Sequence, residues 1–329
     1  GEAAVMNPMQ RLLLEHSYNA LHMCGERRAS LLNSDTGVFV GAWAGDYDRI
    51  ISSTGKGRSI YALSADAAAV MVGRLSFVLG LQGPCTPMDT ACSASLVACH
   101  GALRAVQLAE CEASVIGGVN MMFTSSFGSL MAMAGMTSAC GRSFTFDKRA
   151  DGYARGEAVT MATMATLDAE RVAPSFELRG SAVRQDGKSA SLTAPSGQAQ
   201  QGLLHSALAD ANCDPDELTL HEAHGTGTGL GDPIETGSLS AAVLTMRSPE
   251  VASLRSGGVK ASIGHAEPGA AMTGLLHLAV GLQNSVAMSN VQLRVINSYV
   301  EGNLRGGRCC LPVGIATLDE SSTGAVSSF

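Results

Sequence analysis

The stretch Asp89-Thr-Ala-Cys92-Ser-Ala-Ser-Leu96 sets a short turn-forming segment directly before an apolar helix, with a cysteine in the first turn of that helix. The unpaired N–H groups and the positive dipole end of a helix N-terminus stabilise a thiolate, so we expect the pKa of the Cys92 thiol to lie below about 8.5. A cysteine is more commonly a small buried hydrophobe, and Cys99, two helical turns further on the same face, is predicted to be one. The position of Cys92 at the mouth of the helix, among small neighbours, favours a nucleophile.

The segments around this stretch predict an alternation of helices and strands. The expected elements are a helix over 9–21, a strand over 36–41, a helix over 64–79, a short extended segment over 85–90, a helix from Cys92 to about Glu110 and a strand over 113–119. A strand, helix and strand built from small residues are typical of a parallel sheet covered on both faces. The methionine-rich stretch 121–136 is interpreted as core packing or a pocket wall.

A second alternation begins after Ser175. Its expected elements are a strand over 176–183, a helix over 197–211, a strand over 218–222, helices over 232–245 and 270–284, and a terminal strand over 324–329. A strand over 158–167 closes the first run, and the break lies near residue 170. Two such runs predict two similar α/β halves packed together.

Composition excludes several classes of protein. The 329 residues are 46% hydrophobic and 16% charged with a net charge of -7, which predicts a globular core and argues against binding nucleic acid or an anionic membrane surface. No apolar run approaches the roughly 18 residues of a membrane span. Nine cysteines without a CxxC pair predict a reducing compartment, so we expect an intracellular, cytoplasmic protein, with an organelle left open. The ends of the sequence suggest a fragment.

Two histidine motifs follow in the second run. The segment His221-Glu-Ala-His224-Gly-Thr226-Gly-Thr228 lacks the four-residue spacing of a zinc helix, and its glycines fit no dinucleotide-binding pattern. It offers instead one histidine, two hydroxyls and a glycine backbone that can approach an extended ligand. The segment Lys260-Ala-Ser-Ile-Gly-His265-Ala-Glu267 places a second histidine after a strand. One cysteine and two histidines in such contexts predict a catalytic triad. The polar loop 144–157 fits a structural or a functional role equally well.

The motifs DTACSASL, EAHGTGTGLGDPIE and KASIGHAE resemble the three signatures of β-ketoacyl synthases, specifically the ketosynthase domain of type I polyketide synthases. The segments NPMQRLLLE, TGVFVG, FDKRADGYARGE and GSAVRQDG extend the resemblance in order over nearly the whole chain. It implies a thiolase-like α/β fold of two duplicated halves, with mixed five-stranded sheets and buried helices in α/β/α/β/α layers. The halves would be 1–170, with the nucleophile, and 171–329, with both histidine motifs, and the protein would be a homodimer.

The resemblance also implies roles for individual residues. Cys92 matches the acyl-accepting nucleophile, and His224 and His265 match the pair at the condensation centre. Lys260 and Glu267 match residues that support this pair. Thr226 and Thr228 fall where the family contacts the phosphopantetheine arm.

The implied reaction is acyl transfer to Cys92 followed by decarboxylative Claisen condensation with a malonyl-type thioester, which extends a polyketide or fatty acyl chain. The implied partner is an acyl carrier protein, whose phosphopantetheine, or coenzyme A, carries the acyl and malonyl thioesters. No metal and no bound cofactor are expected.

Two alternatives stay open. A thiolase running the reverse cleavage would need a second catalytic cysteine late in the chain, and Cys309-Cys310 lacks a glycine-flanked context. A non-catalytic ketosynthase-like scaffold or docking partner would keep the fold without the chemistry, although the intact cysteine and histidines argue against it.

Overall fold

The computed structural model describes residues 1–43, 46–167, 174–306, 308–319 and 322–329, and these residues form two compact units. Unit 1 comprises Gly1–Met131, Gly156–Pro174 and Ala266–Thr273. Unit 2 comprises Ala132–Arg155, Ser175–His265 and Gly274–Phe329. The boundary predicted between residues 170 and 171 lies outside the described residues. None of the described helices is both long enough and apolar enough to cross a bilayer.

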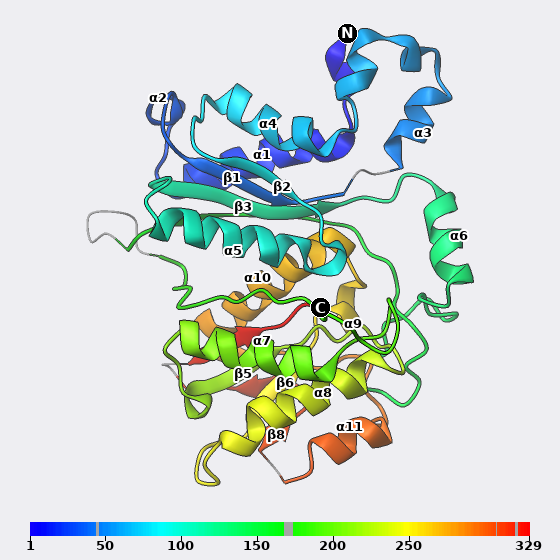
Figure 1. Ribbon diagram of the computed structural model, residues 1–329, viewed down its shortest axis with the longest axis vertical. Helices are drawn as coiled ribbons and strands as arrows, with labels where there is room; N and C mark the ends of the chain where they lie inside the picture. Colours follow the sequence, from blue (N-terminus) through cyan, green and yellow to red (C-terminus); the bar gives the residue numbers. More distant parts are fainter. Residues whose placement is uncertain (44–45, 168–173, 307, 320–321) are drawn as a thin grey trace. The chain divides into compact units, whose positions relative to one another are not determined.

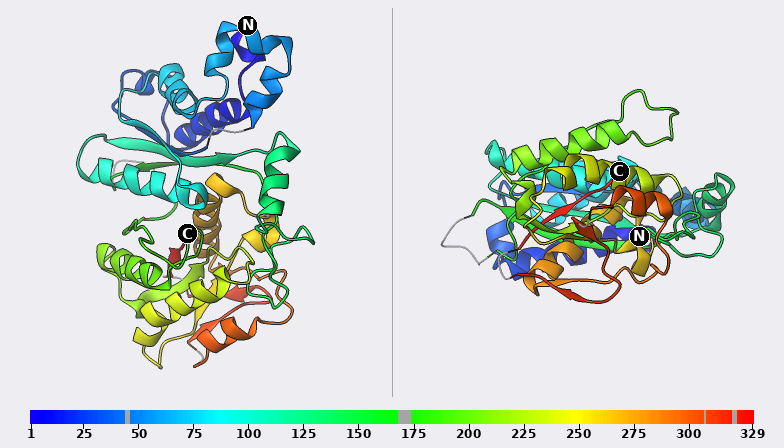
Figure 2. Two further views of the ribbon diagram at one scale, coloured as in Figure 1. Left: turned by 45° about the vertical axis from the view of Figure 1, so that its right-hand side comes forward. Right: turned by 90° about the horizontal axis from the view of Figure 1, so that it is seen from below.

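Unit 1 is a four-stranded sheet in the order β2-β1-β3-β4, with β1 parallel to β2 and β3, and β4 antiparallel to β3. Helices α1 and α4 lie on one face of this sheet and α5 on the other (Figures 1 and 2). The elements are α1 (Pro8–Met23), α2 (Arg28–Leu31), β1 (Gly37–Gly41), α3 (Tyr47–Ser52), α4 (Ala68–Leu79), β2 (Cys85–Met88), α5 (Ala94–Gln107), β3 (Ala113–Asn120) and β4 (Ala158–Ala165).

Local sequence signals set the helix ends in unit 1. The side chain of Asn7 accepts a hydrogen bond from the N–H of Met9, and Pro8 occupies the first helical position, so α1 begins there. The left-handed Gly80, with φ of 77°, ends α4. The apolar faces of α1 and α4 then bury their side chains against β1 and β3 in one core, which includes Met9, Leu13, Met71, Leu75, Val38, Val40 and Val115.

Unit 2 is a four-stranded parallel sheet in the order β10-β5-β6-β8, with a separate two-stranded pair of β7 and β9. Helices α7 and α8 pack on one face of the sheet, and residues 274–283 of α10 pack on the other (Figures 1 and 2). The elements are α7 (Gly197–Asp210), β5 (Leu218–Glu222), α8 (Gly231–Ala242), β6 (Leu254–Gly257), α9 (Lys260–Ile263), α10 (Ala270–Gln283), β7 (Val286–Ala287), α11 (Ser298–Asn303), β8 (Cys309–Cys310), β9 (Ala316–Thr317) and β10 (Thr323–Val326).

One predicted strand is absent. Residues 176–183 form no regular strand in the structure. The segment is held by side-chain contacts instead of a β-ladder: Arg179 pairs with Glu217 at 2.8 Å, and the N–H of Ser181 donates to Asp210 Oδ2 at the end of α7. A strand needs a neighbour to satisfy its backbone groups, and none of the described strands pairs with this segment. Among the described residues, the main sheet of each unit has four strands, not the five that the resemblance implies, and the main sheet of unit 2 is parallel rather than mixed.

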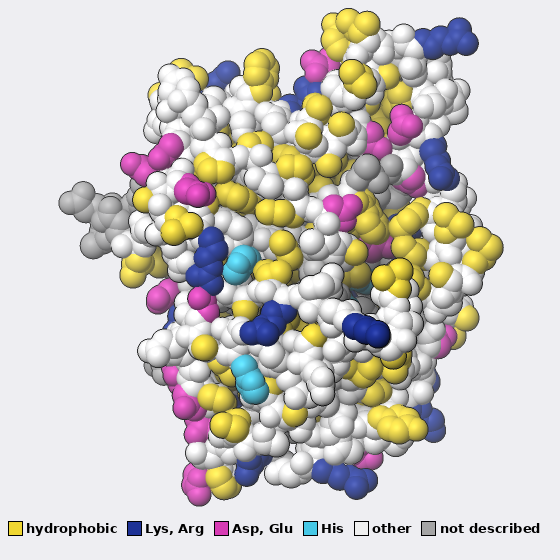
Figure 3. Space-filling model, in the orientation of Figure 1, with side chains coloured by type: hydrophobic (Ala, Val, Ile, Leu, Met, Phe, Trp, Pro, Cys, Tyr) yellow, Lys and Arg dark blue, Asp and Glu magenta, His cyan; other side chains and the backbone are white. Residues whose placement is uncertain are grey.

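The methionine-rich stretch 121–136, interpreted as core packing or a pocket wall, packs against the core of unit 1 only at its start, through Met121 and Phe123. The part that follows forms α6 (Ser125–Met133), and no residue of this helix is buried. Leu130 and Met133 are exposed on the surface, where Figure 3 shows hydrophobic side chains gathered at the place of α6. Cys99, in contrast, is buried in α5 as predicted, and burial raises the pKa of its thiol to about 12.

Candidate active site

The turn that carries Cys92 connects the edge strand β2 to α5 in unit 1. Cys92 is half-buried and lies in η4 (Ala91–Ser93), a 3₁₀ turn directly before the first residue of α5. Ala91 has a left-handed φ of 54°, and Asp89 Oδ1 accepts a hydrogen bond from its N–H at 3.2 Å. A non-glycine residue in this conformation is strained, and such strain clusters at functional sites. The cysteine thus precedes α5 by one turn instead of lying within it.

Two cross-strand glycines bring the start of α5 against the sheet. Gly41 on β1 pairs in register with Gly118 on β3. A Cβ at Gly41 would lie 2.6 Å from the Cα of Ser95, and a Cβ at Gly118 would lie 2.6 Å from the Cβ of Ser95. Because glycine has no side chain, the helix backbone can touch the sheet here. The position of the Cys92 turn therefore depends on the absence of two side chains.

Glu267 also belongs to unit 1. It begins η7 (Glu267–Gly269), which packs against η4, and it is 1% exposed with a left-handed φ of 49°. The side-chain amide of Asn120, at the end of β3, donates to Glu267 Oε2 at 3.0 Å and to the carbonyl of Gly156 at 2.9 Å. Asn120 was not among the residues predicted for the site. Its position at the carboxyl end of a predicted buried strand was the available signal.

His224 and His265 lie side by side in unit 2. Their ring centroids are 5.7 Å apart, with an interplanar angle of 85°. His224 follows the end of β5, whereas His265 follows α9 and forms a β-bridge with Arg155. The ring of Tyr153 packs edge-on against His265 at 4.8 Å. The two motifs that the sequence predicted to cooperate thus meet at one place in unit 2.

Both imidazoles are held in the neutral form. Burial, the charge of Lys260 and the neighbouring His265 lower the pKa of His224 well below 6.5, and burial and Lys260 do the same to His265. Lys260 is itself 3% exposed and begins α9. A neutral histidine donates from one ring nitrogen only. Since the N–H of Phe329 donates to His224 Nδ1 at 3.3 Å, the ring proton of His224 belongs on Nε2, which can donate to a ligand.

Two buried carboxylates at the start of α8 hold the loop that carries His224. Glu235 accepts hydrogen bonds from the N–H groups of His224 and Gly225 at 2.6 and 2.9 Å. Asp232 accepts from the N–H groups of Gly227 and Phe146 at 3.1 and 2.8 Å. Burial raises the pKa of Glu235 to about 7 and that of Asp232 to about 6.

Asp232 and Glu235 were not among the residues predicted for the site, although both lie in the motif EAHGTGTGLGDPIE. Residues three apart on a helix lie on the same face, and a carboxylate in the first turn of a helix is a ready partner for unpaired N–H groups. The glycine-rich loop that precedes Asp232 and Glu235 supplies such groups. Spacing and context together were therefore a usable signal.

The two threonines of the loop contact each other and the helix. Their hydroxyl oxygens lie 3.3 Å apart, and Thr228 Oγ1 accepts from the N–H of Gly231 at 3.1 Å, so Thr228 helps to begin α8. Thr226 is 6% exposed. Unit 2 thus contains Thr226, Thr228 and Lys260 together with both histidines. The other two predicted site residues, Cys92 and Glu267, belong to unit 1.

The neighbouring His221 has a different environment from His224. It is 2% exposed, and its ring nitrogens contact Ser256 Oγ at 2.9 Å and Ser327 Oγ at 3.1 Å. Burial lowers its pKa to about 4, so it is a neutral core residue. The described residues contain no group of three or more histidine, cysteine or acidic side chains placed to hold a metal ion. The loop 144–157 shows the structural role for two of its members, since Arg149 pairs with buried Asp147 at 2.7 Å.

Comparison with protein families matches two models along the chain. The N-terminal domain of beta-ketoacyl synthase matches residues 1–170, and the C-terminal domain of beta-ketoacyl synthase matches residues 175–294. The polyketide synthase GfsB of Streptomyces halstedii is 39% identical over 303 residues, which are 91% of this chain and 5% of that protein. The pikromycin polyketide synthase component PikAII of Streptomyces venezuelae is 40% identical over 289 residues, which are 87% of this chain and 8% of that protein. The chain thus spans less than a tenth of these relatives.

Solved structures agree with the sequence comparison. The ketosynthase from module 6 of the bacillaene synthase of Bacillus subtilis 168 matches with a TM-score of 0.92 and 28% identity, over 100% of this chain and 58% of that chain. The oxazolomycin ketosynthase domain OzmH KS7 of Streptomyces albus JA3453 matches with a TM-score of 0.90 and 29% identity, again over 100% of this chain and 58% of that chain. These matches confirm the predicted thiolase-like α/β fold.

Proposed function

Because the chain belongs to the β-ketoacyl synthase family, we propose that it joins an acyl group to a malonyl-type thioester by decarboxylative Claisen condensation. The product would be a polyketide or fatty acyl chain extended by two carbons of the malonyl unit. The observation that carries the proposal is the pair of neutral imidazoles, His224 and His265, with ring centroids 5.7 Å apart. Such a pair can hydrogen-bond a developing oxyanion without being a proton source that quenches a carbanion.

In the first step, the Cys92 thiolate attacks the carbonyl carbon of an acyl thioester. A new C–S bond forms to Cys92, the bond to the carrier sulfur breaks, and the carrier leaves as a thiol after it takes up a proton. This covalent step divides a difficult transfer into two easier ones. The strained Ala91 immediately before Cys92 supports this assignment, since it fixes the direction in which the chain enters the helix.

In the second step, the malonyl thioester loses carbon dioxide and leaves an enolate. Each preorganised N–H donor to an oxyanion is worth roughly 2.7–4 kcal/mol by analogy with other oxyanion sites. His224 and His265 would supply two. Burial lowers the pKa of both imidazoles, and the positive charge of Lys260 lowers it further because it opposes a second positive charge. The enolate carbon then attacks the Cys92 thioester, a C–C bond forms, and the C–S bond to Cys92 breaks. The 3-ketoacyl product remains on the carrier.

The chain itself supports a role for Cys92 and His265 in the same reaction. The turn η7 packs against the turn that bears Cys92, and η7 begins two residues after His265 in the sequence. Glu267 is the first residue of η7, and its carboxylate accepts a hydrogen bond from the side chain of Asn120. This contact would fix the chain that leads from the His265 motif to η7.

The substrates are proposed to arrive on the phosphopantetheine arm of an acyl carrier protein or on coenzyme A. Thr226 and Thr228 would contact that arm, because their hydroxyls lie on the same glycine-rich loop as His224. The same proposal includes a homodimer and a division of the chain into two halves near residue 170. The matched relatives are polyketide synthases of which this chain spans less than a tenth, and they favour a place within a longer synthase.

Intact-protein mass spectrometry with an acyl thioester donor tests the two steps separately, in the complete polypeptide. We expect Cys92→Ala to abolish the acyl adduct, and His265→Ala to retain the adduct but lose condensation with a malonyl thioester. The control variant Cys140→Ala changes an exposed cysteine and should load acyl groups as the unmodified protein does. An adduct that persists in Cys92→Ala contradicts the assignment of the nucleophile, and a wild-type protein that neither loads nor condenses contradicts the proposed function.

A further inference from the structure

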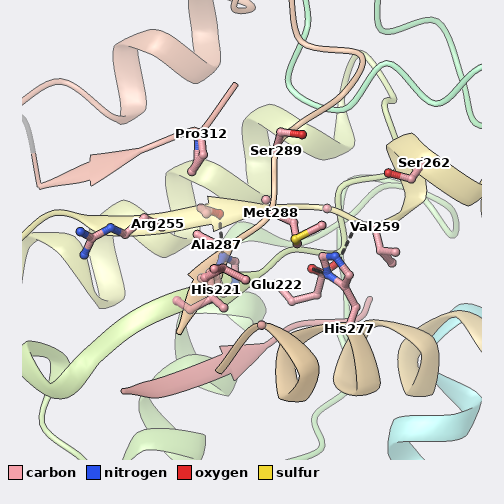
Figure 4. Close-up of a pocket in the computed structure, with 16 residues that line it drawn as sticks. His221, Glu222, Arg255, Val259, Ser262, His277, Ala287, Met288, Ser289 and Pro312 are labelled. Carbon is pink, nitrogen blue, oxygen red and sulfur yellow. Dashed lines mark hydrogen bonds and ion pairs between the residues drawn. The ribbon is translucent and has the colours of Figure 1, made fainter. Parts of the chain in front are cut away.

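Glu222 and His277 form a pair in unit 2 that the proposed reaction does not use. Glu222 is the last residue of β5, and its side chain is 4% exposed. Its Oε2 lies 2.7 Å from Nδ1 of His277 on α10, and its Oε1 accepts a hydrogen bond from the N–H of Val259 at 2.7 Å. Figure 4 shows the carboxylate between these two partners at the wall of a pocket. Both carboxylate oxygens are therefore occupied.

These contacts connect Glu222 to both histidine motifs. Glu222 ends β5 two residues before His224. Val259 directly precedes Lys260, which begins α9. The carbonyl of Glu222 also accepts from the N–H of Ser327 at 3.0 Å, two residues before Phe329, whose N–H fixes the tautomer of His224. One residue thus holds the strand before His224, the turn before Lys260 and the segment that contacts the His224 ring.

We propose that Glu222 and His277 are positioning residues, in which the protonated His277 holds the Glu222 carboxylate on the Val259 N–H and thereby fixes Lys260 relative to His224. The proposal rests on the function proposed above. Neither residue would touch substrate. Their role is to keep the cation of Lys260 at the place where its charge, in addition to burial, lowers the pKa of the two imidazoles. Loss of the pair should lower the rate of condensation while acyl loading of Cys92 continues.

The pair has a predictable dependence on pH. The hydrogen bond that His277 donates to the Glu222 carboxylate raises the pKa of His277 above 6.5, and burial opposes that rise. The other charged or titratable side chains that line this pocket are His221 on β5 and Arg255 on β6. Burial lowers the pKa of His221 to about 4, so this histidine stays neutral, whereas the pKa of His277 is shifted in the opposite direction. Its positive charge is present below its raised pKa and is lost as the pH rises through that value.

The pH profile of condensation, compared with that of acyl loading, tests the proposal in the complete polypeptide. In the wild type we expect condensation to fall on the alkaline side as His277 loses its proton. His277→Lys keeps the positive charge and should move that alkaline limb upward by at least about one pH unit. At pH values below this alkaline limb, His277→Gln should lower the rate of condensation roughly tenfold. The rate should then no longer depend on the protonation of residue 277. Loading of Cys92 should change little in either variant.

An NMR titration and a control variant distinguish this positioning role from a failure of the proposed function. NMR titration of His277 should show its pKa falling toward the ordinary value in Glu222→Gln, and this readout needs no activity. The variant His205→Gln changes an exposed histidine on α7 and should leave both pH profiles unchanged. If the wild type condenses and His277→Lys has the same alkaline limb, the positioning role is wrong while the proposed function stands. If the wild type does not catalyse condensation at all, the proposed function is wrong, and the positioning role that rests on it is wrong as well.

Discussion

The turn that carries Cys92 and the loop that carries His224 both follow a strand that pairs in parallel with its neighbour, but different forces hold them. In unit 1, the start of α5 is fixed by direct backbone packing over Gly41 and Gly118. In unit 2, the loop after β5 is fixed by buried carboxylates, with Glu235 on the N–H groups of His224 and Gly225. The position of the Cys92 turn therefore depends on close packing without side chains, whereas that of the His224 loop depends on charge and hydrogen bonds.

This difference predicts which substitutions each region tolerates. Added volume should damage the Cys92 turn, because a close-packed contact has no room to relax. Lost hydrogen bonds and altered protonation should damage the His224 loop, because a buried polar group without its partner loses its hydration with no compensation.

The largest effect is expected from Gly41→Ala in unit 1. The new Cβ would lie 2.6 Å from the Cα of Ser95, so β1 or the backbone of α5 must move. We expect a loss of about 3 kcal/mol in the free energy of unfolding, measured by denaturant titration, because neither backbone can rotate away as a side chain could.

The control is Gly73→Ala on α4, where an added Cβ meets nothing within 4 Å. Alanine has a higher helix propensity than glycine, so this variant should gain about 0.5–1 kcal/mol. The same substitution would thus act with opposite sign at two positions of one unit. A Gly41→Ala protein as stable as the wild type would show that backbone contact does not fix the Cys92 turn.

A medium effect is expected from Glu235→Ala in unit 2. The change leaves the N–H groups of His224 and Gly225 without their acceptor and costs about 2 kcal/mol of stability. The loop should then lose its geometry, so condensation should fall while acyl loading of Cys92 persists. Glu235→Gln retains one acceptor oxygen and should lose less on both measures. Equal losses in the two variants would indicate that side-chain volume, not hydrogen bonding, holds the loop.

Sequence patterns predicted most of the elements and the pairing of the two histidines, because periodicity and flanking glycines are local signals. The strand β5 lies at its expected residues 218–222, and β3 and α10 lie within one residue of their expected ends. The strand expected over 176–183 is missing because pairing depends on a neighbour that no local pattern specifies. Local β-propensity could not distinguish a paired strand from an extended segment held by Arg179 and Ser181.

The candidate site was predicted less completely than the fold. Cys92 and the two histidines stand in recognisable motifs, whereas the residues that hold them are distant in sequence. Glu222 and His277 are 55 residues apart, and Asn120 and Glu267 are 147 apart. The steric need for glycine at 41 and 118 likewise exists only once β1 and β3 are paired. Motifs identify groups that do chemistry, but tertiary packing decides which groups orient them.

The smallest effect concerns the acid stability of unit 2. The pKa of buried His221 falls from 6.5 to about 4 on folding, so the unfolded chain takes up a proton first as the pH falls. Stability is therefore lost below pH 6.5, over the window between these two values. Asp232 and Glu235 act in the opposite direction, because their raised pKa values let the folded state bind protons first. The pH dependence of wild-type stability combines these two opposing effects. The contribution of His221 is therefore measured as a difference between the wild type and a variant.

His221→Gln provides that difference, since glutamine can still hydrogen-bond Ser256 and Ser327 but does not titrate. At pH 5.5, one unit below the ordinary pKa, removal of the histidine should recover about 1.4 kcal/mol of the stability lost since pH 7.5. Denaturant titrations at both pH values measure this change. His16→Gln on α1 alters an exposed histidine of unit 1 and should leave the acid slope as it is in the wild type. If both variants have the wild-type slope, burial of His221 contributes nothing to acid sensitivity, and the contrast between a steric unit 1 and an electrostatic unit 2 must rest on Glu235 alone.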